Sequence, residues 1–80
     1  MGEVIVLYPR LRDLREDANL SQAKLAKRLG MSQTGYSKYE TGENDIPTAI
    51  LIFLARFYNT SVDYLLGLTN VRESYPRIPG

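Results

Sequence analysis

The chain has 80 residues, of which 44% are hydrophobic and 24% are charged, and its formal net charge is +1. This length allows a single domain with a modest core, and the hydrophobic fraction is too high for a disordered chain. Cysteine and histidine are both absent, which removes disulfides, the commonest zinc ligand and the commonest general base. We therefore expect no enzymatic activity, no metal site and no cofactor.

The apolar runs are too short for a membrane span, which needs roughly 20 residues. The longest covers residues 49–55 and ends at Arg56. The N-terminal residues carry neither a basic start nor a small-residue cleavage site, so a signal peptide is not expected. The sequence therefore predicts a cytoplasmic protein.

An N-terminal arm, residues 1–8, is predicted ahead of the domain. Val4, Val6 and their neighbours form a β-prone run, but a single strand has no partner within the chain. This run either frays or pairs with the same run of a second copy.

The first predicted helix follows Pro9. Leu11, Leu14 and Ala18 recur at spacings of three and four residues and so mark one apolar face. Charged residues, beginning with Arg10, fill the other side.

Serine and glycine residues indicate the ends of the next two helices. Ser21 is a typical N-cap for the second helix, and Gly30 stands where a left-handed residue ends it. Ser32 is the expected N-cap of the third helix, which ends at Gly42. The predicted apolar residues of these two helices are Leu25, Ala26, Leu29, Tyr36 and Tyr39.

Two further helices complete an all-α domain. Pro47 is expected in the first turn of the fourth helix, which reaches about Tyr58. Ser61 caps a short fifth helix that Gly67 closes. The sequence thus predicts a compact five-helix domain over residues 9–68, followed by a mobile C-terminal tail over residues 69–80.

The second and third helices carry the functional signal. Two short helices joined by a tight turn that contains glycine form a helix-turn-helix, whose second helix fits the major groove of B-DNA. The third helix would present short polar side chains on one face, with tyrosines anchoring the other. These candidate base-reading residues are Gln33, Thr34, Ser37 and Lys38.

The residues 20–26, Leu-Ser-Gln-Ala-Lys-Leu-Ala, and 31–42, Met-Ser-Gln-Thr-Gly-Tyr-Ser-Lys-Tyr-Glu-Thr-Gly, resemble the phage-repressor-like, Cro-type (XRE) family. The resemblance covers about residues 11–67 and closes on Ser-Val-Asp-Tyr-Leu-Leu-Gly at residues 61–67. It implies a lambda-repressor-like five-helix fold, dimeric binding to a palindromic double-stranded operator, and transcriptional repression.

The resemblance also implies roles for particular residues. Gln33, Thr34 and Lys38 match the base-reading positions of the family, and Gln22 matches its phosphate-contacting glutamine. A helix N-terminus suits that role because it presents free N–H groups to a phosphate. Arg15 and Glu40 match a pair that bridges the first helix to the end of the third.

Ser21 and Lys24 are further candidates for phosphate contact, because they lie beside Gln22 at the start of the second helix. Lys24, Lys27 and Arg28 also fit a solvated helix face.

Two features depart from the family pattern. Glu43 and Asp45 make the loop after the third helix acidic, which would repel phosphate. Gly35 lies inside the reading helix and costs up to about 1 kcal/mol relative to alanine, while allowing close approach to the groove.

The fourth helix is apolar on two sides. One stripe would face the core, and the other is either covered by the fifth helix or exposed as a homodimer interface formed by Ile50, Phe53 and Phe57. Two alternatives to a phage-type repressor remain. One is an antitoxin that also binds a toxin, and the other is a protein-interaction module that does not bind DNA.

Overall fold

A computed structural model describes residues 8–73, and within this range the chain forms five α-helices. They are α1 (Pro9–Asp17), α2 (Gln22–Leu29), α3 (Gln33–Thr41), α4 (Thr48–Phe57) and α5 (Val62–Leu65). The helical class and the number of helices agree with the sequence prediction, although α5 is a single turn. The predicted strand pairing through Val4 and Val6 lies outside the described residues.

The helix ends lie where the capping residues indicated. The Oγ atoms of Ser21, Ser32 and Ser61 each accept a hydrogen bond, at 3.0 Å, from the backbone N–H three residues later. Gly30 and Gly42 adopt left-handed φ values of 72° and 82° at the ends of α2 and α3. The serine caps satisfy N–H groups at the helix starts, and the glycine N–H groups satisfy carbonyls at the helix ends, which a helix leaves without internal partners.

Pro47 has a slightly different place from the one predicted. Its ψ of 148° is extended, so it is the residue before α4 rather than a member of the first turn. Its carbonyl still accepts hydrogen bonds from the N–H groups of Ile50 and Leu51 and thereby starts the helix.

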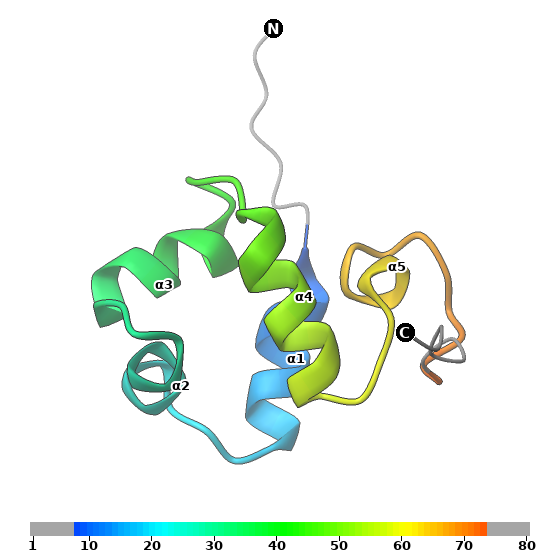
Figure 1. Ribbon diagram of the computed structural model, residues 1–80, viewed down its shortest axis with the longest axis horizontal. Helices are drawn as coiled ribbons and strands as arrows, with labels where there is room; N and C mark the ends of the chain where they lie inside the picture. Colours follow the sequence, from blue (N-terminus) through cyan, green and yellow to red (C-terminus); the bar gives the residue numbers. More distant parts are fainter. Residues whose placement is uncertain (1–7, 74–80) are drawn as a thin grey trace, which may run out of the picture.

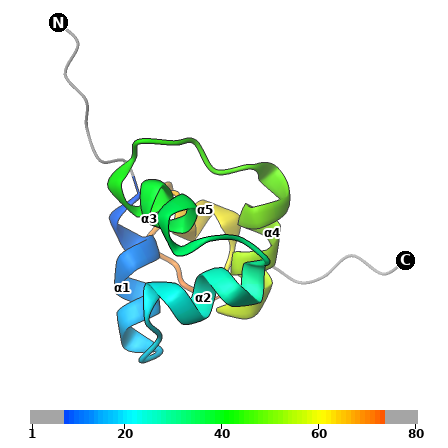
Figure 2. The ribbon, with the colours of Figure 1, turned by 90° about the vertical axis from the view of Figure 1, so that its left-hand side faces the viewer.

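The core brings all five helices together. Its fully buried members include Tyr36 on α3, and its apolar residues are Leu11, Leu14, Leu25, Ala26, Tyr36, Tyr39, Leu54, Ala55, Tyr58 and Leu65. In Figure 1, α1 lies behind α4, with α2 and α3 to one side and α5 to the other. Figure 2 turns the left-hand side of Figure 1 toward the viewer and shows α2 and α3 together on that side. This agrees with their direct packing.

One prediction for α1 was wrong, and one of its charged residues has contacts that the sequence did not indicate. Ala18 is exposed, because α1 ends at Asp17 and Ala18 is its C-cap. Arg10 is not simply a solvated charge: its guanidinium lies 4.0 Å from the centre of the Tyr64 ring and donates to the Tyr64 carbonyl at 2.9 Å. Arg10 therefore joins the start of α1 to α5.

The segment after α5 is also held more firmly than the expected mobile tail. Arg10 donates to the Thr69 carbonyl and to Asn70 Oδ1, and Thr60 pairs with Glu73 in an isolated antiparallel bridge. The chain therefore passes Arg10 at residues 69–70 and meets the α4–α5 connection at residues 72–73, while the rest of the predicted tail lies outside the described residues. Within the described range, no helix is long and apolar enough to span a membrane.

Candidate nucleic-acid interface

A surface hollow joins the start of α2 to the polar face of α3. All four candidate base-reading residues line it, together with one candidate phosphate-contacting residue and two residues from the end of α3 and the following loop. The lining residues are Gln22, Gln33, Thr34, Ser37, Lys38, Thr41 and Glu43. The hollow therefore gathers the residues that the motif singled out onto one face, which we call the α3 face.

The two tyrosines of α3 fix which side of the helix faces outward. Tyr36 is fully buried and Tyr39 is 9% exposed, and their rings meet edge to face with centroids 6.1 Å apart. Since both tyrosines are anchored in the core, the opposite side of α3 must face solvent. Gln33 and Thr34 are exposed at the first turn of that side.

Thr41 was missed by the sequence analysis. It lies three residues after Lys38, and its Oγ1 donates to the Lys38 carbonyl at 3.2 Å. Helical periodicity extended by one further turn would have placed it on the α3 face.

The ion pair expected between Arg15 and Glu40 is present. Arg15 Nε donates to Glu40 Oε2 at 2.6 Å, and Arg15 Nη2 donates to Glu40 Oε1 at 3.1 Å. The two side chains are only 11% and 5% exposed. Arg15 Nη1 also donates to the Leu20 carbonyl at 2.8 Å, so the guanidinium fixes the α1–α2 connection as well as the end of α3.

Gln22 extends this pair to the surface. Its Nε2 donates to Glu40 Oε1 at 3.0 Å, which ties the first residue of α2 to α3. An amide group carries two N–H donors, so one hydrogen bond to Glu40 leaves the second donor for a ligand. Burial alone would raise the pKa of Glu40, but the polar groups around its carboxylate, above all the hydrogen-bonded Arg15 guanidinium, outweigh burial and lower that pKa.

Two tyrosine hydroxyls are buried around this carboxylate. Tyr36 Oη and Tyr58 Oη have no hydrogen-bond partner of normal geometry among the described residues. Burial, followed by the negative charge of Glu40, raises the pKa of both hydroxyls, and that of Tyr58 reaches about 12. Both tyrosines therefore remain neutral at physiological pH, and Glu40 carries the negative charge of the cluster.

The other two candidate phosphate-contacting residues, Ser21 and Lys24, do not line the hollow of the α3 face. Ser21 is exposed, and its hydroxyl accepts the capping bond from Lys24 N while keeping its own O–H free to donate. The Lys24 side chain lies in a different hollow, lined by Leu20, Lys24, Lys27 and Arg28. Ser21 therefore stays beside the α3 face, whereas Lys24 belongs to the basic side of α2.

Gly35 has a packing role that the sequence did not reveal. A Cβ atom at this position would lie 3.1 Å from Met31 Cε and 3.2 Å from Ser32 Oγ. Glycine therefore makes room for the capping serine and for Met31.

The acidic loop lies partly against the interface. Glu43 is exposed and lines the hollow with Lys38, and Asn44 N donates to the Lys38 carbonyl at 3.1 Å. Asp45 is exposed but does not line this hollow. Glu43 is thus the acidic residue placed to oppose phosphate.

The predicted dimer stripe on α4 is only partly exposed. Ile50 and Phe57 pack against the core, whereas Phe53 is 37% exposed. Phe53 lines a groove together with Arg28 and Arg56, two positively charged residues. Its aromatic surface therefore lies between basic side chains.

The arrangement of α2 and α3 defines the class of protein. Two short helices meet at a turn around a left-handed glycine, and the second presents a polar face while its tyrosines anchor it. This is a helix-turn-helix domain.

The helix-turn-helix family model matches residues 11–65, and the chain belongs to this XRE-type family. It is 43% identical over 61 residues to the uncharacterized HTH-type transcriptional regulator YobD of Bacillus subtilis, covering 76% of this chain and 54% of YobD. It is 38% identical over 58 residues to the cryptic phage CTXphi transcriptional repressor RstR of Vibrio cholerae, covering 72% of this chain and 52% of RstR.

A shorter relative matches over most of both chains. Control protein C.SmaI of Serratia marcescens is 38% identical over 68 residues, which cover 81% of each chain. The chain spans about half the length of YobD and RstR, so the match concerns only part of those two proteins.

Proposed function

We propose that this protein is a transcriptional repressor that binds operator DNA by inserting α3 into the major groove. The observation that carries the proposal is the single hollow shared by Gln22 and the polar residues of α3 that lie opposite its buried tyrosines. Amide side chains suit adenine, and lysine suits the acceptors on guanine. Under this proposal Gln33, Thr34, Ser37 and Lys38 face base edges, and the bound protein excludes RNA polymerase from the DNA.

The start of α2 is the proposed phosphate site. The first N–H groups of a helix lack internal partners and lie at the positive end of its dipole. Lys24 N is already bonded to the capping serine, which leaves the N–H groups of Gln22 and Ala23 for a phosphate oxygen. Ser21 and the second amide N–H of Gln22 would donate to the same phosphate, while Lys24 would contact the backbone further along.

The proposal is tested by selecting duplexes from a random pool and measuring affinity by fluorescence anisotropy. Gln33→Ala and Lys38→Ala should weaken binding to the selected duplex by roughly 1–3 kcal/mol and relax preference at one or two base pairs. Lys27→Ala is the matched control, because it removes a lysine outside the α3 face. Full affinity and an unchanged consensus in both test variants would refute the reading role of α3.

We further propose that the repressor acts as a homodimer on a palindrome. One short helix reads only a few base pairs, whereas two copies about 34 Å apart read both half-sites. The proposed contact surface is centred on Leu68 and Val71, which are 72% and 57% exposed. Arg10 and the Thr60–Glu73 bridge hold this segment in a fixed conformation, which reduces the entropy lost on association.

We propose this surface as the dimer interface in place of the apolar stripe predicted on α4. A two-fold contact through Phe53 would bring Arg28 and Arg56 of both copies close together. Sedimentation equilibrium separates the two surfaces: Leu68→Glu should shift the protein toward monomer, whereas Phe53→Lys should not. A monomer at micromolar concentration with operator present would refute the dimer, and a monomer produced only by Phe53→Lys would restore the α4 interface.

A further inference from the structure

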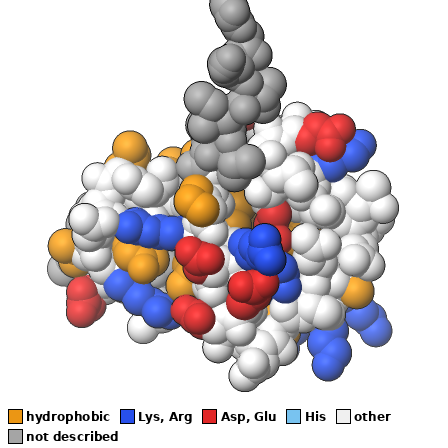
Figure 3. Space-filling model, turned by 180° about the vertical axis from the view of Figure 1, so that it is seen from behind, with side chains coloured by type: hydrophobic (Ala, Val, Ile, Leu, Met, Phe, Trp, Pro, Cys, Tyr) orange, Lys and Arg blue, Asp and Glu red, His pale blue; other side chains and the backbone are white. Residues whose placement is uncertain are grey.

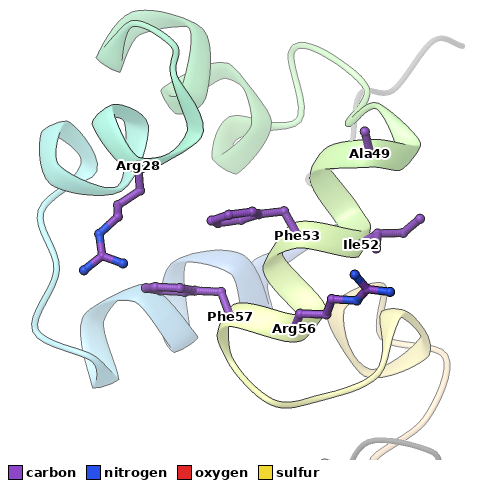
Figure 4. Close-up of a pocket in the computed structure, with 6 residues that line it drawn as sticks. All are labelled: Arg28, Ala49, Ile52, Phe53, Arg56 and Phe57. Carbon is purple, nitrogen blue, oxygen red and sulfur yellow. The ribbon is translucent and has the colours of Figure 1, made fainter. Parts of the chain in front are cut away.

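An apolar groove runs along α4, is bordered by Arg28 of α2, and is distinct from the α3 face. It is lined by Arg28, Ala49, Ile52, Phe53, Arg56 and Phe57, none of which lines the α3 face. We call it the α2–α4 groove. Figure 4 shows the Phe53 and Phe57 side chains projecting from α4 toward α2, with Arg28 beside them and Arg56 on the other side of α4.

The floor of the groove is aromatic and remains open to solvent. The rings of Phe53 and Phe57 are nearly parallel, with centroids 5.9 Å apart. Phe53 is 37% exposed and Ile52 is 43% exposed, although each is large enough to gain from burial. A floor of this kind favours a partner with apolar side chains.

The two charged residues that line the groove, Arg28 and Arg56, are both basic. Arg28 lies 5.5 Å from the centre of the Phe57 ring, and Arg56 is exposed at the C-terminal end of α4. The hollow that shares Arg28 adds Lys24 and Lys27, and no described residue lining either hollow is acidic. The rear face differs, because positive and negative side chains alternate over it (Figure 3).

The aromatic floor and the two arginines together restrict which kind of molecule can bind in the groove. DNA would satisfy the arginines but would leave Ile52 and Phe53 against phosphates, which offer no apolar surface. A second copy related by a two-fold axis would place arginines against arginines. A protein segment with apolar side chains flanked by carboxylates matches both the floor and the two arginines.

We propose that the α2–α4 groove is a docking site for an acidic amphipathic helix of a partner protein. Phe53 and Phe57 lie one helical turn apart, so they form an apolar ridge against which residues at i, i+3, i+4 and i+7 of a helix can pack. The carboxylates of the partner pair with Arg28 and Arg56 at the two sides.

A helix fits this groove better than an extended strand. Both walls are α-helices, whose backbone N–H and C=O groups are already bonded within each helix. The groove therefore offers no free edge to which a strand could add, and recognition must come from side chains.

The proposal is tested with a fluorescein-labelled peptide of about 18 residues, long enough to form a stable helix. Leucines occupy one face of the peptide and glutamates its flanks, and the control peptide has lysine at every glutamate position. Anisotropy at physiological salt should detect binding of the acidic peptide alone. Amide shifts of the ¹⁵N-labelled protein should concentrate on residues around Arg28, Phe53 and Phe57.

Matched arginine variants locate the interaction. Arg56→Glu should weaken peptide binding about three- to tenfold, because the reversal replaces an attraction with a repulsion. Arg72→Glu makes the same charge change at an exposed residue outside the groove and should leave affinity within about twofold. Phe53→Ala, with its fold checked by thermal melting, should reduce affinity about tenfold through lost apolar contact.

Three results would overturn the proposal. Equal losses in the Arg56 and Arg72 variants would mean that the peptide responds only to overall charge. Amide shifts that avoid the groove would place the peptide elsewhere. A dimer that dissociates when Phe53 or Arg56 is changed would assign the groove to a second copy of the chain.

Discussion

Replacing Glu40 with glutamine tests whether the buried ion pair organises the interface. The substitution preserves shape and one oxygen acceptor but leaves the Arg15 guanidinium, 11% exposed, without its counter-ion. Removing one partner of a buried pair costs about 3–5 kcal/mol, whereas an exposed pair contributes about 1 kcal/mol or less. Since Arg15 keeps its bond to the Leu20 carbonyl, we expect a loss of about 3 kcal/mol. Small domains are stable by only about 5–15 kcal/mol, so this loss should be conspicuous.

Urea denaturation followed by far-UV circular dichroism measures the change in the free energy of unfolding. Glu16→Gln is the matched control, because it breaks the Arg12–Glu16 pair, whose side chains are 67% and 53% exposed. The control should lose less than about 1 kcal/mol. A loss below about 1 kcal/mol in Glu40→Gln would refute the reasoning, since the pair would then stabilise no more than a surface contact.

The same pair predicts a pH dependence with a definite sign. The folded-state pKa of Glu40 is lowered from its ordinary value of 4.5. Its contribution to stability is therefore complete above about pH 4.5 and is lost as the pH falls through the lower folded-state pKa. The stability gap between the wild-type protein and Glu40→Gln should accordingly narrow on acidification. A constant gap from neutral pH down to pH 2 would contradict the assignment.

Further variants test the interface loop and α3. Glu43→Lys should raise the affinity for all duplexes and steepen the slope of log affinity against log salt concentration by about 0.9 per added phosphate contact. Asp45→Lys should have a smaller effect, because Asp45 lies outside the hollow. Unchanged binding in both variants would place the loop away from DNA. Gly35→Ala should change the free energy of unfolding by less than about 0.5 kcal/mol, because crowding of Ser32 Oγ and Met31 Cε offsets the usual helix gain of about 1 kcal/mol. Urea denaturation measures the change in the free energy of unfolding. A full gain of about 1 kcal/mol would show that Ser32 and Met31 move aside without cost. The acidic helical peptide should also lower the affinity of the protein for the selected duplex, since the carboxylates of the peptide would approach Lys24. Unaltered DNA affinity at saturating peptide would show that the groove and the DNA interface act independently.

Local signals in the sequence were sufficient to predict where the helices lie. Ser21, Ser32 and Ser61 cap helices because a serine side chain can accept the bond that a first-turn N–H lacks, whatever the rest of the fold does. Tyr36 and Tyr39 were placed in the core by spacing alone. Their burial determines which side of α3 faces outward, so the candidate base-reading residues also followed from the sequence.

Contacts between distant segments were beyond such reasoning. Arg10 reads as one surface charge among several, yet it joins α1 to Tyr64 and to the segment after α5, 54 or more residues away. Whether an apolar stripe is buried likewise depends on which helix lies across it. Ile50 and Phe57 pack onto the core, whereas Phe53 stays exposed between two arginines, although their spacing in the sequence made them equivalent.

The sequence by itself thus determined the five helices, most of their ends, the buried tyrosines and the helix-turn-helix, because caps and periodicity depend on residues within a few positions of one another. Only the tertiary structure decided that Gln22 joins the expected Arg15–Glu40 pair and that two arginines border an aromatic groove along α4. Both features depend on how helices pack across the core, and that arrangement is fixed by the complementarity of whole surfaces rather than by any local pattern.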